Sequence, residues 1–226
     1  MAVSKKIETL VPKVRREAPN CPKSIIIDEL RNSLIDFCVN TDIYMQELTP
    51  FVVAANVNEY EANDLDIPAG AELNHIIDIF RSSSDSTVRL SQKNLSPLEA
   101  KAQIGSQSIF KTYRTGRAKY YTQRDQENIL IAPTPDATET FYALYSLKPT
   151  VTSTTIPSII ANEYKEAIVH GALYRLQMMK DSPWTDLQAA ELNKRMYDKA
   201  EALAVRKTIY GNVGASLTVH CHEFGF

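Results

Sequence analysis

The chain has little of what marks an extracellular or membrane protein. Its 226 residues hold three cysteines, Cys21, Cys38 and Cys221. An odd, sparse set is unlike a disulfide framework and is typical of reduced thiols. No apolar run approaches the roughly 18 residues that span a bilayer, and the N-terminal residues lack the apolar core of a signal peptide. We therefore expect no membrane partner and synthesis in a cytoplasm-like compartment.

A large charge of one sign is also missing. The formal net charge is -2 and the isoelectric point is about 6.1, so no global positive field draws the protein to phosphates. With only seven glycines and 44% hydrophobic residues, the composition is that of a folded protein. The length allows one large domain, or one domain carrying a small second one, each with a proper core.

Sequence signatures of common catalytic sites are missing as well. There is no G-x-S-x-G, no P-loop and no H-E-x-x-H in the sequence. His170 lies among apolar residues of a predicted helix, which is typical of a core or interface histidine. His220 and His222 project to one side of a predicted strand, but zinc sites usually have three or four protein ligands. We expect no enzyme activity, no metal and no cofactor.

Helices are predicted at both ends of the chain. Residues 4–17 form a short amphipathic helix interrupted by Pro12, and residues 22–46 form a long helix with apolar residues at intervals of three or four. A further helix starts at Pro157 and contains residues 163–179. The last helix spans 182–206, with Ser182 as N-cap and Pro183 in its first position. Its predicted apolar seam comprises Ala189, Leu192, Met196 and Leu203.

The middle of the chain reads as β-rich. Strands are predicted in 51–64, at 75–80 and at 86–90, followed by one short helix at 96–105. A three-stranded meander follows at 119–123, 128–133 and 140–149, and the last of these strands is apolar on both faces, so we expect cover on both sides.

This order predicts an α+β fold, in which helices from the two chain ends pair because isolated helices of this length are marginal in water. A small antiparallel β domain is inserted into the resulting helical bundle, and an extended tail follows. The expected parts are residues 1–48 and 156–206 for the bundle, 49–155 for the insert and 207–226 for the tail.

The helix at 163–179 is apolar on more than one face, and a helix apolar nearly all round must be enclosed. Gly171 costs about 1 kcal/mol relative to alanine inside a helix, and it is kept where another backbone comes close. The covering surface is either the domain's own long helix or a neighbouring subunit. The candidate interface residues are Tyr164, Ile168, Gly171, Ala172 and Met178.

Two further segments are candidates for binding. Residues 110–124 interleave tyrosines with basic side chains, a pattern that can stack bases and neutralise phosphates. Without a nucleic-acid-binding motif, the charge balance of the whole chain favours the other interpretation, a loop and exposed strand with the tyrosines on the core side. The candidate DNA-facing residues are Lys111, Arg114, Arg117, Lys119 and Arg124. The C-terminal tail can add a strand to a partner or dock aromatic anchors. Its candidate contacts are Tyr210, Leu217, Val219, Phe224 and Phe226.

The chain resembles the head-to-tail adaptor, or connector, proteins of tailed bacteriophages. The resemblance is carried by "DIPAGAEL", by "ILIAPTPDATETFYALYSLKPT", and by the block from Ile156 to Ala200 with its Gly-Ala contact and Pro-Trp turn. It implies a structural role in the virion, in a twelve-fold ring at the head-tail junction, assembled in the host cytoplasm. The implied partners are other copies of the chain, the portal protein, a tail or nozzle protein, and genomic DNA passing through the channel without sequence-specific binding.

A second interpretation stays open at this point. The chain can also be an enzyme or a monomeric binding module, in which its own bundle uses all of the helix at 163–179 and the tail is disordered.

Overall fold

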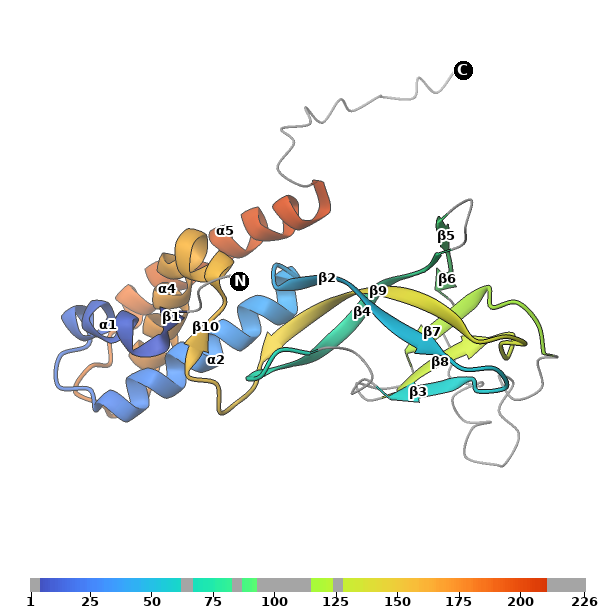
Figure 1. Cartoon of the computed structure of the whole chain (residues 1–226). Coiled ribbons are helices and arrows are strands. Elements are labelled where there is room, and N and C mark those ends of the chain that lie inside the picture. Colours follow the sequence, from blue (N-terminus) through green and yellow to red (C-terminus); the bar gives the residue numbers. More distant parts are fainter. Residues whose placement is uncertain (1–4, 62–66, 83–86, 93–114, 124–127, 211–226) are drawn as a thin grey trace, which may run out of the picture.

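The computed structural model describes residues 5–61, 67–82, 87–92, 115–123 and 128–210. Helices gather at one end of the molecule and strands at the other (Figure 1). The strands between residues 45 and 149 lie in the sequence between the N-terminal and C-terminal helices. The predicted α+β class is therefore confirmed. The short helix predicted at 96–105 lies outside the described residues.

The two chain ends meet at the start of the fold. Strand β1 (Lys5–Lys6) pairs antiparallel with β10 (Thr155–Ile156), directly before the C-terminal helices. A 3-10 helix (Ile7–Leu10) leads into α1 (Val11–Glu17). Pro12 lies in the first turn of α1, where a missing N–H leaves no helical hydrogen bond unmade.

Helix α2 (Lys23–Thr41) is shorter than predicted. Asp42 adopts a left-handed φ of 51°, and its N–H donates to the Cys38 carbonyl at 3.1 Å, which ends the helix. Residues 45 and 46 belong instead to strand β2 (Met45–Val53). The predicted end at residue 46 is therefore wrong, and β2 runs across the boundary expected at residue 48.

The C-terminal helices begin with a π-helix (Ile160–Tyr164) that continues into α4 (Lys165–Gln177). Helix α5 (Leu187–Tyr210) starts later than predicted because Asp186, not Ser182, caps it. The Asp186 Oδ1 atom accepts hydrogen bonds from the N–H groups of Gln188 at 3.1 Å and Ala189 at 3.0 Å. The helix then continues to Tyr210, four residues beyond the predicted end.

The helices share one hydrophobic core. Leu30, Leu34 and Phe37 of α2 are fully buried in it together with Ile168 and Leu173 of α4. Helix α1 adds Val11 and Val14, and α5 adds Ala204. An ion pair between Lys13 and Glu166 ties α1 to α4. The hydrogen bond from Lys13 is the main reason that the pKa of Glu166 is lowered.

The strands form two further four-stranded sheets. One has the order β2-β9-β4-β5, with β9 (Glu139–Pro149), β4 (Ala71–Ser82) and β5 (Thr87–Arg89). The other has the order β3-β8-β7-β6, with β3 (Glu59–Glu61), β8 (Asn128–Ala132), β7 (Tyr120–Gln123) and β6 (Ser91–Gln92). All pairings are antiparallel except that of β6 with β7.

The predicted meander is wrong in its last step. Strands β7 and β8 pair as expected, but β9 lies in the other sheet, between β2 and β4. The segment after β8 therefore crosses between sheets instead of closing a hairpin. On β9, Phe141, Ala143 and Tyr145 are fully buried, whereas Tyr142 and Leu144 are half-buried, so one face has less cover than predicted.

The helical body and the first sheet are joined at the end of α2. Tyr44 packs against both hydrophobic cores, and its carbonyl accepts a hydrogen bond from the Leu147 N–H at 2.8 Å. The Asn74 side chain donates to Asp42 Oδ1 at 3.2 Å, and His75 Nε2 lies 3.5 Å from Asp42 Oδ2. These contacts connect the residue that ends α2 to strand β4.

Gly171 lies where α4 passes between α2 and α5. A Cβ at this position would overlap Ser33 Oγ of α2 and would lie 2.7 Å from Tyr197 Cδ2 of α5. The Ser33 hydroxyl also donates to the Ile168 carbonyl at 3.1 Å, which holds α2 close to α4. The glycine at position 171 predicted that another segment comes close to the α4 backbone. In the structure, two helices of the same chain, α2 and α5, do so.

Replacing Gly171 with alanine should destabilise the protein. The overlap is expected to cost about 1–3 kcal/mol, which exceeds the gain of about 1 kcal/mol in helix propensity. Urea denaturation of G171A and of G171A/S33A measures this, and the second variant should recover part of the loss through coupling between the two sites. A G171A protein more stable than the parent would contradict the packing described here.

Candidate functional site

The five residues proposed for a subunit interface lie on or next to α4. Ile168, Gly171 and Ala172 are buried within the chain. Tyr164 is half-buried and contacts Phe37, with ring centroids 5.3 Å apart and the rings tilted by 44°. Met178 is 51% exposed. The second apolar face of α4 was expected to be covered either by the chain's own long helix or by a neighbouring subunit. In the structure, α2 and α5 of the same chain cover α4.

A buried polar chain fixes α4 against α5. His170 Nδ1 lies 2.7 Å from Asn193 Oδ1, and Asn193 Nδ2 donates to Gln177 Oε1 at 2.9 Å. Asn193 and Gln177 are both almost completely buried. Because buried amides need their hydrogen-bond partners, this chain favours one register between the two helices. His170 thus has the structural role that its apolar surroundings predicted.

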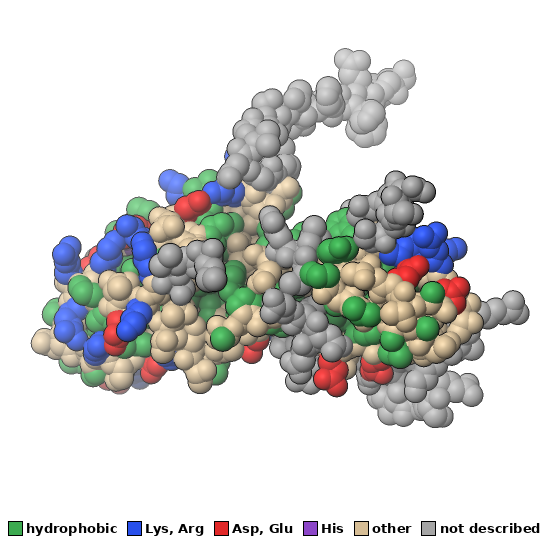
Figure 2. Space-filling view, viewed as in Figure 1, with side chains coloured by type: hydrophobic (Ala, Val, Ile, Leu, Met, Phe, Trp, Pro, Cys, Tyr) green, Lys and Arg blue, Asp and Glu red, His purple; other side chains and the backbone are tan. Residues whose placement is uncertain are grey.

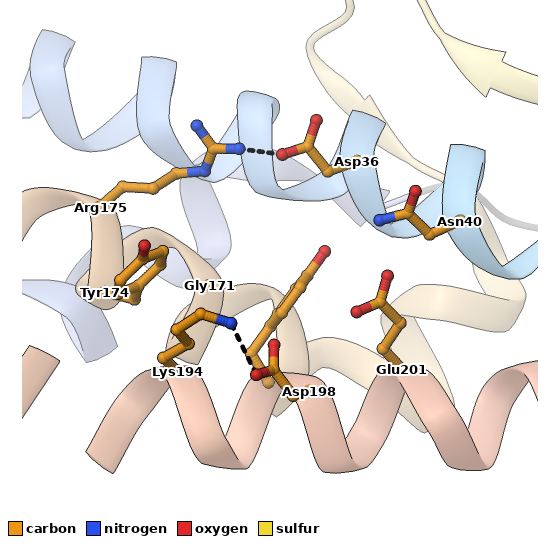
Figure 3. Close-up of a pocket in the computed structure, with 9 residues that line it drawn as sticks. Asp36, Asn40, Gly171, Tyr174, Arg175, Lys194, Asp198 and Glu201 are labelled. Carbon is orange, nitrogen blue, oxygen red and sulfur yellow. Dashed lines mark hydrogen bonds and ion pairs between the residues drawn. The ribbon is translucent and has the colours of Figure 1, made fainter. Parts of the chain in front are cut away.

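A polar groove of about 290 Å³ opens above Gly171, between α2, α4 and α5 (Figure 3). Asp36 forms an ion pair with Arg175 across it, and Lys194 Nζ lies 2.7 Å from Asp198 Oδ2. The hydrogen bond with Asp198 is the main reason that the pKa of Lys194 is raised. Burial raises the pKa of Tyr197, so its phenol stays neutral.

The groove is built as a set of paired charges rather than as a reaction centre. Two of its carboxylates, Asp36 and Asp198, already bind its cations Arg175 and Lys194, and its lining includes no histidine, cysteine or serine that would form a nucleophile and base. Within the described residues, no group of three His, Cys, Asp or Glu side chains is placed to hold a metal ion. Likewise, no described helix has both the length and the hydrophobicity to cross a membrane.

Helix α5 presents its side chains differently from the prediction. The predicted seam is largely exposed, with Leu192 57%, Met196 46% and Leu203 55% accessible. The fully buried residues of α5 are small or polar, namely Ala190, Asn193 and Ala204, and half-buried Tyr197 packs inward over Gly171. The prediction was wrong because it placed the largest apolar residues inside, whereas the narrow space beside α4 accepts alanine.

The candidate DNA-facing residues are only partly described. Arg117 and Lys119 are exposed beside strand β7, and Lys111, Arg114 and Arg124 lie outside the described residues. Figure 2 shows that Lys and Arg side chains also gather over the end of the molecule that carries α1. Arg15 and Arg16 are exposed there. This second basic surface was visible in the sequence as "KVRR" but was counted only as the polar side of a helix.

The candidate docking tail lies almost entirely outside the described residues. Tyr210 is the last residue of α5, and Leu217, Val219, Phe224 and Phe226 lie beyond the described part of the chain, as do His220 and His222.

Replacing Asn193 with leucine should break the polar chain. The Gln177 amide would lose a buried partner, which costs about 1–3 kcal/mol. Urea denaturation checks this. The double variant N193L/Q177L should recover part of the loss, because removing both partners avoids an unpaired buried group. An N193L protein as stable as the parent would show that the polar chain does not hold the two helices together.

No curated protein matches the chain. A family model described as SU10 adaptor protein matches residues 6–216. This range includes every helix and strand that the structure describes, apart from Lys5 at the start of β1. The resemblance to phage head-to-tail adaptors is thereby confirmed at the level of the family. The chain belongs to the SU10 adaptor protein family, whose members are structural adaptors of bacteriophages.

Proposed function

We propose that this chain is a head-to-tail adaptor that forms a ring, with twelve copies as the expected number, on the portal of a bacteriophage. The observation that carries the proposal is the family match over residues 6–216. The ring continues the DNA channel below the portal and receives a tail or nozzle protein on its other side. Its work is binding rather than catalysis, and it acts at the head-tail junction of the virion.

The fold supports a role in transmitting contacts between two partners. The helical body and the first sheet share Tyr44, and the end of α2 is hydrogen-bonded to strand β4 through Asp42. A protein built this way can hold one partner at its helical end and another at its β end without a flexible joint between them. We also expect the adaptor ring to assemble in the host cytoplasm, before the phage tail is attached.

The C-terminal tail is the proposed contact with the portal. It continues directly from α5, and its residues Leu217, Val219, Phe224 and Phe226 offer alternating apolar and aromatic anchors. Specific interfaces of this kind bury upwards of about 1,000 Å² in total. A segment of sixteen residues after Tyr210 is long enough to reach a neighbouring protein.

Genomic DNA is the proposed content of the ring, held without sequence-specific binding. Lys111, Arg114, Arg117, Lys119 and Arg124 are the basic residues proposed to line the channel. Exposed Arg117 and Lys119 beside β7 are consistent with this placement. The exposed Arg15 and Arg16 on α1 are a second basic surface that the ring can present to phosphates.

Truncation after Gly211 should abolish binding to the portal without unfolding the protein, because the described core ends at Tyr210. Mass photometry of the truncated chain mixed with the phage's own portal measures assembly, and circular dichroism measures folding.

A matched pair of full-length variants separates anchoring from tail length. F224S/F226S should weaken assembly, whereas H220A/H222A should leave it unchanged. Assembly of the truncated chain at the parental level would contradict the tail's role. A full-length chain that stays monomeric in the presence of the portal would instead favour an enzyme or a monomeric binding module.

A further inference from the structure

Positive charge is concentrated in one short part of the chain. Residues 5–23 contain six lysines and arginines and two glutamates, whereas the whole chain has a formal net charge of -2. The segment therefore carries +4 and the other residues together carry -6. Although the protein as a whole has no positive field, a local excess of this size attracts polyanions.

The fold brings these charges to one end of the molecule. The segment forms β1, the 3-10 helix and α1, and it ends at the first residue of α2. Lys and Arg side chains lie together over this end in the space-filling view (Figure 2). The side chains of Lys6, Arg15 and Arg16 are exposed. We call Lys6, Arg15 and Arg16 the α1 basic surface.

The positive charge of the α1 basic surface is not neutralised by nearby carboxylates. Glu8 already pairs with Lys23 at 2.8 Å, and Glu166 pairs with Lys13. No acidic side chain that the structure describes forms an ion pair with the α1 basic surface. These three cations therefore remain available to an anion from another molecule.

The same surface lacks exposed apolar residues. Ile7, Leu10, Val11 and Val14 are all buried in the chain's own core, and no large hydrophobic residue between positions 5 and 23 is exposed. Protein interfaces place apolar or aromatic anchors at their centre, and helices that lie on membranes insert an apolar face. Cations without such anchors are typical of surfaces that contact the phosphates of a nucleic acid.

The α1 basic surface is also held in place before anything binds. Strand β1 pairs with β10, and the Ile7 N–H donates to the Thr154 carbonyl at 2.9 Å. The ion pair of Lys13 with Glu166 fixes α1 against α4. Binding through this surface therefore requires little ordering of the backbone, which lowers the entropic cost of the contact.

The other basic candidates lie in a more mixed surface. Arg117 and Lys119 lie beside β7, at the opposite end of the molecule from α1 (Figure 1). Strand β3 of the same sheet exposes Glu59 and Glu61. Carboxylates in the same sheet weaken the attraction of this end for phosphates. The charge distribution therefore favours the helical end over the β end.

We propose that the α1 basic surface binds the sugar-phosphate backbone of double-stranded DNA. The contact is electrostatic and independent of base sequence, because it consists of cations that neutralise phosphates. This inference rests on the proposed function, since a channel for genomic DNA is what brings a duplex to the helical end. It adds the surface of the protomer that makes the main contact.

Removing two of these cations tests the contact. Fluorescence anisotropy of a duplex of about 30 base pairs, titrated with the full chain between about 50 and 200 mM salt, gives the slope of log affinity against log salt. R15A/R16A should lower the affinity at about 50 mM salt by more than about tenfold and make the slope less steep by about 2. Each lost phosphate contact removes about 0.9 released counterion, which is the reason for the change in slope.

Two variants with the same change of charge accompany it. K199A/R206A is the control, because it removes two exposed cations from α5, and it should bind the duplex as the parent does. R117A/K119A tests the β end and should have a smaller effect than R15A/R16A. Circular dichroism verifies that each variant is folded, and mass photometry with the phage's portal measures assembly, which R15A/R16A should leave unchanged.

Several results would overturn the inference. Absence of binding by the parental chain, or equal losses in the α1 variant and the α5 control, would show that α1 makes no specific contact with the duplex. A larger loss in the β7 variant would place the duplex at the β end. Binding to phosphatidylserine vesicles in preference to the duplex would make the surface a membrane contact, and loss of assembly by the folded α1 variant would make it a protein contact.

The proposed function fails in a different way. If the parental chain does not assemble on the portal, the adaptor role is contradicted. Salt-dependent binding of the duplex that is lost only in the α1 variant would still support the assignment of the α1 basic surface.

Discussion

The packing of α4 between α2 and α5 is the contact on which the rest of the molecule depends. Gly171 lets Ser33 and Tyr197 come close to the α4 backbone, and no larger residue fits there without displacing one of them. Since α2 precedes the strands in the sequence and α4 and α5 follow them, this contact joins the two ends of the chain, together with the pairing of β1 with β10 and the ion pair of Lys13 with Glu166. The polar groove and the chain of His170, Asn193 and Gln177 both lie beside it.

That packing also decides which surfaces are left for partners. Because α2 and α5 of the same chain enclose α4, its apolar side chains lie in the protein's own core. The narrow space beside α4 selects alanine on the inner side of α5, and the larger Leu192, Met196 and Leu203 remain outside. The chain thus buries its core within one protomer and keeps a separate apolar surface on α5 exposed.

Much of this organisation could be predicted from the sequence, and the failures have physical causes. The α+β class, the order of elements and the close contact at Gly171 follow from periodicity, proline positions and the cost of glycine in a helix. The end of α2 was missed because a left-handed Asp42 is not distinguished from a helical one in a single sequence. The partner of β9 was missed because strand pairing depends on tertiary packing, which local turn length does not reveal. The α5 seam was assigned to the wrong side because hydrophobicity alone does not reveal that the space beside α4 accepts only small side chains such as Ala190 and Ala204.

Hydrogen exchange of the isolated chain, followed residue by residue, tests the central claim most directly. If one chain encloses α4, the amides around Gly171 should be among the slowest to exchange in the free protein, and assembly on the portal should leave them unchanged. Rapid exchange of those amides in the free chain, with protection appearing only on assembly, would contradict the claim and would return α4 to the contact between subunits.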